Sequence, residues 1–276
     1  MGIPGPNKVS AILRLIRPLN LGIIFFSFLL AFHLTEHPLL YRDLLLAAAY
    51  LLLAAAGYAV NDIRDMEIDA VNRPERPLPM GLPPDEARRM AIILAIAALS
   101  PMFFFSFILF LFTLLVGILL YLYAYMPRKG LFLGNVAVAL ATTSPFSAVA
   151  LYKGYTSPLG LAFLFSFLII WMREIAKDFD DLEGDKAAGR ETLPIIAGKE
   201  KGLLFLWVLT FILAGFTMWG SLIVQRRLVY ALLIVGGVNF CNAGALVVMK
   251  KGLYRRAALF YKVSILMGLG GLWLSV

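Results

Sequence analysis

Seven acidic and amide side chains, grouped at two places in the chain, have the types and spacing of a metal site. The string NDIRDMEID holds Asn61, Asp62, Asp65 and Asp69, and the string DFDDLEGD holds Asp178, Asp181 and Asp185. Both contain Asp-x-x-Asp-x-x-x-Asp, and the second copy follows the first at a constant offset of 116 residues. Mg²⁺ prefers oxygen ligands such as carboxylates, together with phosphate oxygens and water. The pattern therefore predicts two acidic stripes that hold Mg²⁺ against a diphosphate.

Steps of three and four residues place side chains on one face of a helix, so each run predicts a stripe at a helix end. Stacked like charges destabilise a helix, and burying them near a membrane costs more, which a divalent cation would offset. The alternative for a single run is a solvated acidic helix end that pairs with Arg64, Arg73 or Lys177. Two copies at one spacing favour the metal site and suggest a duplicated unit.

Basic and polar residues that suit phosphate oxygens accompany the acidic runs. The alternative role for these residues is to orient the protein in a membrane or to contact lipid headgroups. They are Arg73 and Arg76 after the first run, Lys186 and Arg190 after the second, and Tyr125 and Lys129 in a third connection.

The composition requires a membrane protein. Hydrophobic residues make up 61% of the 276 residues and charged residues only 15%, whereas a soluble domain carries about 25% charged residues. Nine apolar runs each approach the ~20 residues that cross a bilayer. They predict an all-α, polytopic membrane bundle with nine transmembrane helices, folded as a single domain over residues 1–276. The runs cover 17–35, 40–63, 86–106, 107–125, 131–152, 157–176, 202–223, 228–249 and 254–275.

The net charge of +8 is distributed in a way that speaks against nucleic-acid binding and for membrane topology. Nine spans place all Lys and Arg on the N-terminal side except Arg42, Lys153, Arg226 and Arg227. The positive-inside rule then predicts a cell-membrane protein with that side in the cytoplasm. Two long charged connections, 61–89 and 173–201, lie on the same side and are expected to cap an active site.

At these residues the chain resembles the UbiA superfamily of intramembrane prenyltransferases. NDIRDMEIDAVNRPERPLPMG is similar to the Asn-Asp-x-x-Asp-x-x-x-Asp of that family and the Arg-Pro-x-Pro-x-Gly that follows it. MREIAKDFDDLEGDKAAGRETLP looks like the branch that includes archaeal digeranylgeranylglyceryl phosphate synthases, and chlorophyll synthases share part of it. Many family members carry Asp where this chain has Glu174. The resemblance implies that the helices surround a central cavity.

The resemblance also implies roles for individual residues. Asn61, Asp65, Asp69, Asp178, Asp181 and Asp185 would ligate Mg²⁺. Arg73, Arg76, Tyr125, Lys129, Lys186 and Arg190 would contact the diphosphate or close the site. Asn20 matches a family position in the first span, and Arg17 is expected to face the same cavity.

The expected reaction is Mg²⁺-dependent transfer of a geranylgeranyl group from geranylgeranyl diphosphate to the hydroxyl of geranylgeranylglyceryl phosphate. Asp69 or Glu174 would receive the hydroxyl proton, and Tyr125 and Lys129 would assist. An aromatic or tetrapyrrole acceptor remains an alternative, because scattered span residues form the acceptor pocket. A cation-coupled transporter would also explain repeats and acids, but transporters usually place ionisable groups near the bilayer midplane.

Overall fold

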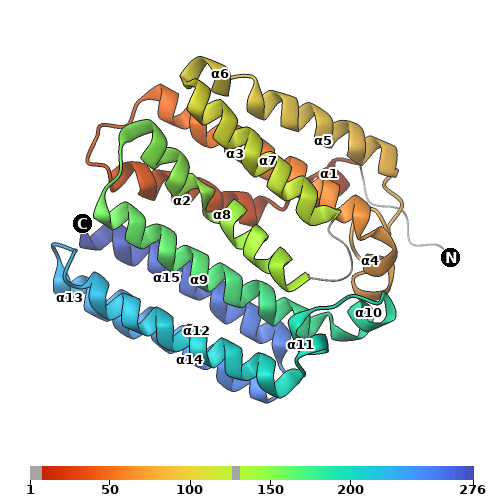
Figure 1. Ribbon diagram of the computed structural model, residues 1–276. Helices are drawn as coiled ribbons and strands as arrows, with labels where there is room; N and C mark the ends of the chain where they lie inside the picture. Colours follow the sequence, from red (N-terminus) through yellow and green to blue (C-terminus); the bar gives the residue numbers. More distant parts are fainter. Residues whose placement is uncertain (1–7, 126–130) are drawn as a thin grey trace. The chain divides into compact units, whose positions relative to one another are not determined.

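The structure is a computed structural model that describes residues 8–125 and 131–276. These residues form two compact units. Of the described residues, 8–25 and 40–125 belong to unit 1, and 26–39 and 131–276 belong to unit 2. The helices of each unit are drawn in Figure 1, and the units are considered one at a time below.

Unit 1 is built around one long apolar helix. This helix, α3, packs along α5 and against α7 and α1, and a cluster of small and aliphatic side chains, including Leu15, Ala59 and Ala87, fills the space between α1, α3 and α5. The helices of this unit are α1 (Lys8–Ile16), the first part of α2 (Pro18–His33), α3 (Tyr41–Arg64), α4 (Met66–Asn72), α5 (Pro84–Leu99), α6 (Met102–Phe105) and α7 (Phe107–Ala124).

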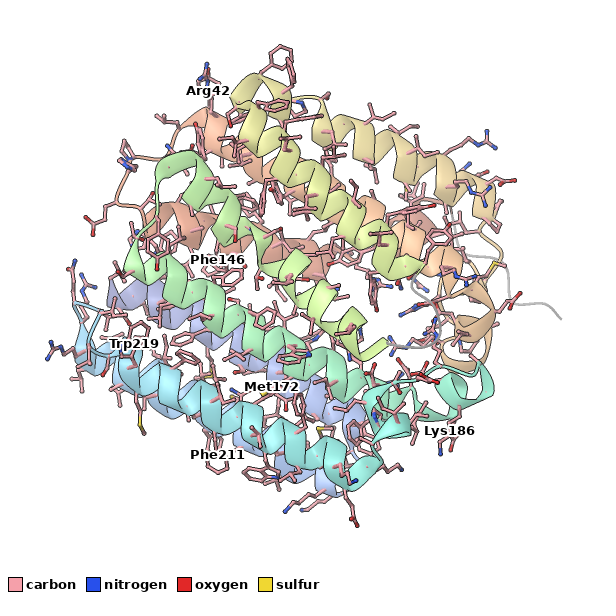
Figure 2. The ribbon with its side chains drawn as sticks, viewed as in Figure 1. Arg42, Phe146, Met172, Lys186, Phe211 and Trp219 are labelled. Carbon is pink, nitrogen blue, oxygen red and sulfur yellow. The ribbon has the colours of Figure 1, made fainter. Side chains whose placement is uncertain are left out.

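Unit 2 is organised around α9, which packs against α8, α15 and α12. Met172 is fully buried in this packing (Figure 2), and the Thr210 hydroxyl donates a weak hydrogen bond to its sulfur at 3.6 Å. The helices are α8 (Leu131–Lys153), α9 (Ser157–Asp180), α10 (Leu182–Ala187), α11 (Leu193–Ile196), α12 (Lys199–Gly220), α13 (Arg227–Tyr230), the π-helix η1 (Ala231–Val238), α14 (Asn239–Lys250) and α15 (Tyr254–Ser275).

Among the described residues, eight helices are long and apolar enough to cross a bilayer, and the number becomes nine if α1 and α2 count as one bent span. The all-α membrane fold predicted from the apolar runs is therefore confirmed. The first predicted span, 17–35, corresponds to α2, and the short helix α1 precedes it. The chain bends by 43° between α1 and α2, because Pro18 follows Arg17 and the residue before a proline avoids the helical region.

The two connections predicted as long loops are largely helical. Residues 61–64 are the last turn of α3, α4 follows after Asp65, and α5 already begins at Pro84. In the same way 173–180 belong to α9, and α10 and α11 occupy much of the remainder. Several acids of each motif therefore lie at the end of a spanning helix. Helix geometry, rather than a flexible loop, fixes their positions.

The internal repeat predicted from the aspartate spacing extends to the helix boundaries. Helices α3 and α9 are both 24 residues long, and each bound of α9 lies 116 residues after the matching bound of α3. Each helix stops at the central aspartate of its motif, with φ/ψ of −90°/5° at Asp65 and −92°/10° at Asp181. A short helix then starts at the next residue in both copies. The two motifs thus share one backbone design.

Candidate active site

Asp62 is the best-paired acid of the first motif. Its side chain is 3% exposed at the end of α3, and both Arg17 and Arg76 donate hydrogen bonds to the same carboxylate oxygen, Oδ1. The Arg76 contact measures 3.4 Å. A buried carboxylate is costly unless it is paired. The two guanidinium groups therefore satisfy the Asp62 carboxylate, which in turn fixes the positions of both arginines.

Arg17 reaches Asp62 because of an unusual backbone conformation. Its φ is +53°, a region that few non-glycine residues occupy. This strained residue lies at the bend before Pro18, where the chain leaves α1. Its guanidinium group also lies over the Tyr58 ring, 4.9 Å from the ring centre. Asn20, expected beside Arg17, is half-buried in the first turn of α2. The structure thus connects Arg17 to the first acidic motif.

Asp69 lies in α4 with 5% of its surface exposed. Arg76 donates a charge-assisted hydrogen bond to it as well as to Asp62, so one guanidinium joins two acids of the motif. Burial raises the pKa of Asp69 to about 6, although Arg76 opposes the shift. A carboxylate with a raised pKa is a better proton acceptor than an ordinary aspartate.

Asn61 and Asp65 form the adjacent part of the stripe. The Asn61 side-chain amide donates to Asp65 Oδ2 at 3.0 Å. Backbone hydrogen bonds run from Asp65 to Asn61, from Asp69 to Asp65 and from Arg73 to Asp69, each 2.8 or 2.9 Å long. The four residues therefore follow one another at the helical spacing predicted from the sequence, despite the break in the helix at Asp65.

In the second motif Asp178 is held by an amide. The Asn135 side chain, 5% exposed on α8, donates to Asp178 Oδ2 at 2.6 Å. Asp178 lies 116 residues after Asp62, so the equivalent aspartate of each copy has a partner from an earlier segment of the chain, Arg17 between α1 and α2 or Asn135 on α8. The partner is a cation in unit 1 and a neutral amide in unit 2.

Asp181 and Asp185 continue the second motif across the break between α9 and α10. Asp185 is 3% exposed, and Arg190 binds it twice, through its side chain at 3.5 Å and through its backbone N–H to the Asp185 carbonyl at 2.8 Å. Lys186 is exposed on α10 (Figure 2). Arg190 therefore lies at the acids, as its predicted role requires, whereas Lys186 extends toward solvent.

Glu174 is buried one turn before Asp178, between two cations. Arg173 contacts one of its oxygens at 2.6 Å and Lys177 contacts the other at 2.5 Å. A buried carboxylate needs such partners. Glu174 thereby holds Arg173 and Lys177 in position.

Tyr125 follows the end of α7 and lies with its ring 5.8 Å from the Arg64 guanidinium, on the outside of unit 1. It is 47% exposed. Lys129, predicted to contact the diphosphate, lies outside the described residues.

The donor set suits Mg²⁺ although no cluster is already assembled. Among the described residues, no three Asp, Glu, His or Cys side chains gather as a metal site. Each motif nevertheless supplies several oxygen ligands at helix ends, the donor chemistry that Mg²⁺ takes in proteins alongside substrate phosphates. Asn61, Asp65 and Asp69 are the ligands available in unit 1, and Asp178, Asp181 and Asp185 those in unit 2.

Sequence reasoning missed two residues of this site. Asp62 was noticed in the repeat but given no role, although two arginines converge on it. Asn135 was not noticed at all. Its signal was a single amide inside the apolar run LFLGNVAVAL, and an intramembrane polar side chain is a functional candidate by default.

Replacing Asn135 with alanine is expected to raise the Mg²⁺ concentration for half-maximal turnover about 10- to 100-fold, because a partner that orients a metal ligand typically contributes that much. Mg²⁺ titration of turnover measures the effect. Ser144→Ala on the same helix is the control, since Ser144 bonds only the Ala141 carbonyl in its own helix. Equal Mg²⁺ dependence in the two variants would contradict the role of Asn135.

The fold and the motifs define a class of protein: a helical membrane enzyme with two aspartate-rich helix ends. Residues 20–267 match the UbiA prenyltransferase family. The chain belongs to this family and is a multi-pass membrane prenyltransferase. Membership favours the enzyme interpretation over the transporter interpretation.

Curated relatives and solved structures agree with this assignment. The chain is 35% identical over 202 residues to a digeranylgeranylglyceryl phosphate synthase of Methanoculleus marisnigri, and the matched region covers 72% of each of the two chains. It is 28% identical to a solved structure described as concerning digeranylgeranylglyceryl phosphate synthase in membranes, with a TM-score of 0.73 and coverage of 97% and 98%. A UbiA homologue of Archaeoglobus fulgidus bound to DMAPP and Mg²⁺ shares the fold, with 18% identity, a TM-score of 0.64 and coverage of 95% and 99%.

Proposed function

We propose that the protein transfers a geranylgeranyl group from geranylgeranyl diphosphate to the free hydroxyl of geranylgeranylglyceryl phosphate, which makes the precursor of an archaeal-type ether lipid. The observation that carries the proposal is the repeated aspartate motif at two helix ends, in a prenyltransferase with curated relatives named for this product. The C1–O bond of the allylic diphosphate breaks, the acceptor oxygen bonds to C1, and diphosphate leaves.

Mg²⁺ would be held by Asn61, Asp65 and Asp69 of the first motif and by Asp178, Asp181 and Asp185 of the second. When bound, it neutralises negative charge that develops on the leaving diphosphate. The A. fulgidus homologue is bound to Mg²⁺ together with a prenyl diphosphate, and its shared fold supports a cation in this chain.

Arginines and lysines of the chain would bind the diphosphate oxygens. Arg76 already lies beside Asp69 and Asp62, and Arg190 beside Asp185. Arg73 caps the C-terminal end of α4, where its backbone N–H donates to the Asp69 carbonyl. Its side chain therefore begins next to the first motif. We extend the same role to Lys129, and assign Lys186 to closing the site from its exposed position.

The acceptor hydroxyl must lose its proton as the ether bond forms. Of the two acids considered from the sequence we assign this proton to Asp69, which lies outside the spanning helices and pairs with one cation, Arg76, whereas Glu174 is held by two cations. Asp69 then has two functions, as ligand and as base. Arg17, Asn20 and Tyr125 complete the predicted substrate-contacting set.

We further propose that the N-terminus and both motifs face the cytoplasm and that residues 1–276 act as one domain. Charge supports the orientation, because the spans leave nearly all Lys and Arg on that side. Labelling of single-cysteine variants at Glu67 and Gly154 with a membrane-impermeant reagent in right-side-out vesicles tests it. Only the Gly154 variant should react, and reaction at Glu67 would reverse the orientation.

A turnover assay tests the reaction. Purified full-length protein with Mg²⁺ and labelled geranylgeranyl diphosphate should form a lipid ether with geranylgeranylglyceryl phosphate, and EDTA should abolish the product. An aromatic quinone precursor and a tetrapyrrole alcohol serve as the other acceptors. If either of these acceptors gave a prenylated product and geranylgeranylglyceryl phosphate gave none, the proposed acceptor would be wrong. Absence of diphosphate release from any allylic donor would contradict prenyl transfer itself.

A further inference from the structure

Unit 1 carries an apolar groove of about 460 Å³ on the side of α3 that faces away from Asp62. Helices α3, α5 and α7 form it, and all but three of its sixteen lining residues are apolar or glycine. The three are Arg88, Tyr121 and Tyr125. A groove of this volume falls in the range of small-molecule sites, about 300–1,000 Å³.

The groove is separate from the acidic motif. Val60 and Ile63 of α3 line it. At roughly 100° per residue, Asp62 projects from the opposite side of the helix to Val60, where it meets Arg17 and Arg76. The groove is therefore not the place where the paired acids lie. The residue that it shares with the substrate-contacting set proposed above is Tyr125, at one end of the groove.

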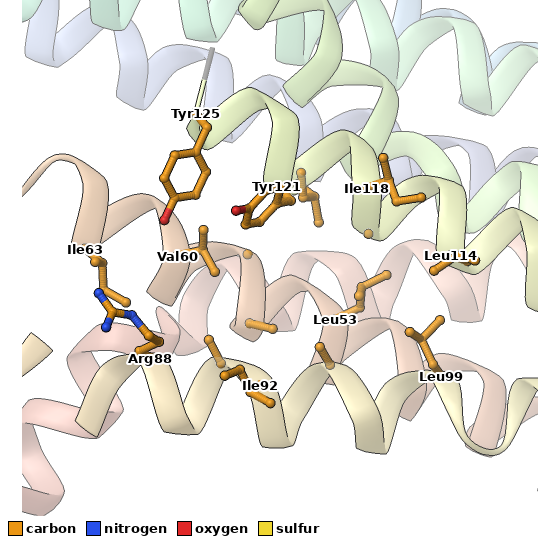
Figure 3. A pocket seen from close by; sticks show the side chains of 16 residues that line it. Leu53, Val60, Ile63, Arg88, Ile92, Leu99, Leu114, Ile118, Tyr121 and Tyr125 are labelled. Atoms are coloured by element: carbon orange, nitrogen blue, oxygen red, sulfur yellow. The ribbon is translucent and has the colours of Figure 1, made fainter. Parts of the chain in front are cut away.

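The polar residues gather at one end of the groove. Figure 3 shows Arg88 and Tyr125 at that end, and Leu99 and Leu114 at the other. Arg64 adds a second cation there, because its guanidinium lies over the Tyr125 ring. Tyr125 and Tyr121 are half-exposed, with 47% and 54% of their surfaces accessible. Tyrosines of this kind mark the level of lipid headgroups in membrane proteins.

All three helices of the groove are long and apolar enough to span the membrane. The groove therefore faces the hydrocarbon of the bilayer, where acyl or isoprenoid chains of lipids contact it. Arg88 pairs with Asp85 at 3.1 Å, but both side chains are mostly exposed, at 61% and 75%. Such a pair contributes little, and a guanidinium can exchange it for a phosphate, which it binds with two parallel hydrogen bonds.

We propose that this groove binds an anionic glycerophospholipid of the membrane, with one chain between α3, α5 and α7 and the phosphate at Arg88. The charge at the mouth selects the headgroup, and the apolar walls hold the chain. Since α3 carries the groove on one side and Asp62 on the other, the lipid supports the helix that positions the first motif. The site is independent of the identity of the prenyl acceptor.

Native mass spectrometry of the full-length protein tests the site, with phosphatidylglycerol and phosphatidylcholine of identical chains as probes. Wild-type protein should retain one phosphatidylglycerol in preference to phosphatidylcholine. Ala95→Phe fills the groove and should reduce retention of both lipids about tenfold. Ala97→Phe, on the same helix but outside the groove, should bind both lipids as wild-type protein does. Ala95 lines the groove and Ala97 is exposed beside it.

Arg88→Gln should lower the preference for phosphatidylglycerol about fivefold, the contribution of one cation near an anionic headgroup. Arg89→Gln is its neighbour control, because Arg89 is exposed and does not line the groove. The Arg88 variant changes an exposed side chain, so it remains informative if Ala95→Phe fails to fold. Equal lipid retention by all variants would overturn the proposal. Stoichiometric displacement of the lipid by geranylgeranyl diphosphate would also overturn it, because the groove would then belong to the reaction.

Discussion

Replacing Asp65 or Asp181 with alanine is expected to lower the turnover number about 1,000-fold while leaving the fold intact. Both aspartates occupy the break between a spanning helix and a short helix, and both are only partly buried. Each substitution removes one proposed oxygen ligand of Mg²⁺ from one motif. Several kcal/mol of charge stabilisation come from such a cation, and each 1.36 kcal/mol corresponds to a tenfold change in rate. Single-turnover kinetics at saturating Mg²⁺ measures the loss.

Each of these variants has a neighbour as its control. Glu67→Ala changes an exposed acid two residues after Asp65, and Asp180→Ala changes an exposed acid directly before Asp181. Both should keep turnover within about threefold of wild type, because neither acid belongs to the proposed ligand set. If Asp65→Ala or Asp181→Ala kept more than a tenth of wild-type turnover, that motif would not carry the reaction.

Replacing Asp62 with alanine is expected to destabilise the protein as well as inactivate it. Asp62 is the shared partner of Arg17 and Arg76, and removal of one member of a buried ion pair typically costs about 3–5 kcal/mol. The remaining guanidinium groups lose their common anchor, and Arg17 loses the contact that offsets its strained backbone. The apparent melting temperature in detergent should fall by on the order of 10 °C.

Asp85→Ala provides the comparison for this effect. Asp85 also pairs with an arginine, but that pair is exposed to solvent and is expected to contribute less than about 1 kcal/mol. The Asp62 variant should therefore melt well below the Asp85 variant. Coincident melting temperatures would show that the Asp62 pairs do not support the fold.

The sequence predicted the fold class and the repeat because both depend on local patterns. Apolar runs of about 20 residues identify spans without knowledge of their partners, and the equal spacing of the aspartates indicated two similar helix ends. The break at Asp65 and Asp181 is a finding of the structure. The boundary predicted between the runs 86–106 and 107–125 is also confirmed. Helix α5 ends at Leu99, and α7 starts after Ser106, which caps it with a 3.1 Å hydrogen bond to the Leu109 N–H.

The details that the sequence did not yield depend on contacts between distant segments. Arg17 and Asp62 are 45 residues apart, and Asn135 and Asp178 are 43 apart, so no local period reveals either pair. The sequence predicted helix ends at the acidic runs of 61–89 and 173–201, but not the separate short helices α4, α10 and α11, where Arg76 and Arg190 pair with acids that would destabilise an isolated helix. The assignment of ligands stays a prediction in both motifs, and so do the central cavity and the single domain.

The two copies of the motif, although built alike, have become electrically different. At the equivalent first aspartate, one half has Arg17 and Arg76 while the other has the neutral Asn135. Two copies of one motif would be interchangeable if their partners matched, and an exchange of guanidinium for amide is enough to end that equivalence. The equivalent substitutions Asp62→Asn and Asp178→Asn would therefore have unequal consequences, because only the first removes a carboxylate that two arginines share.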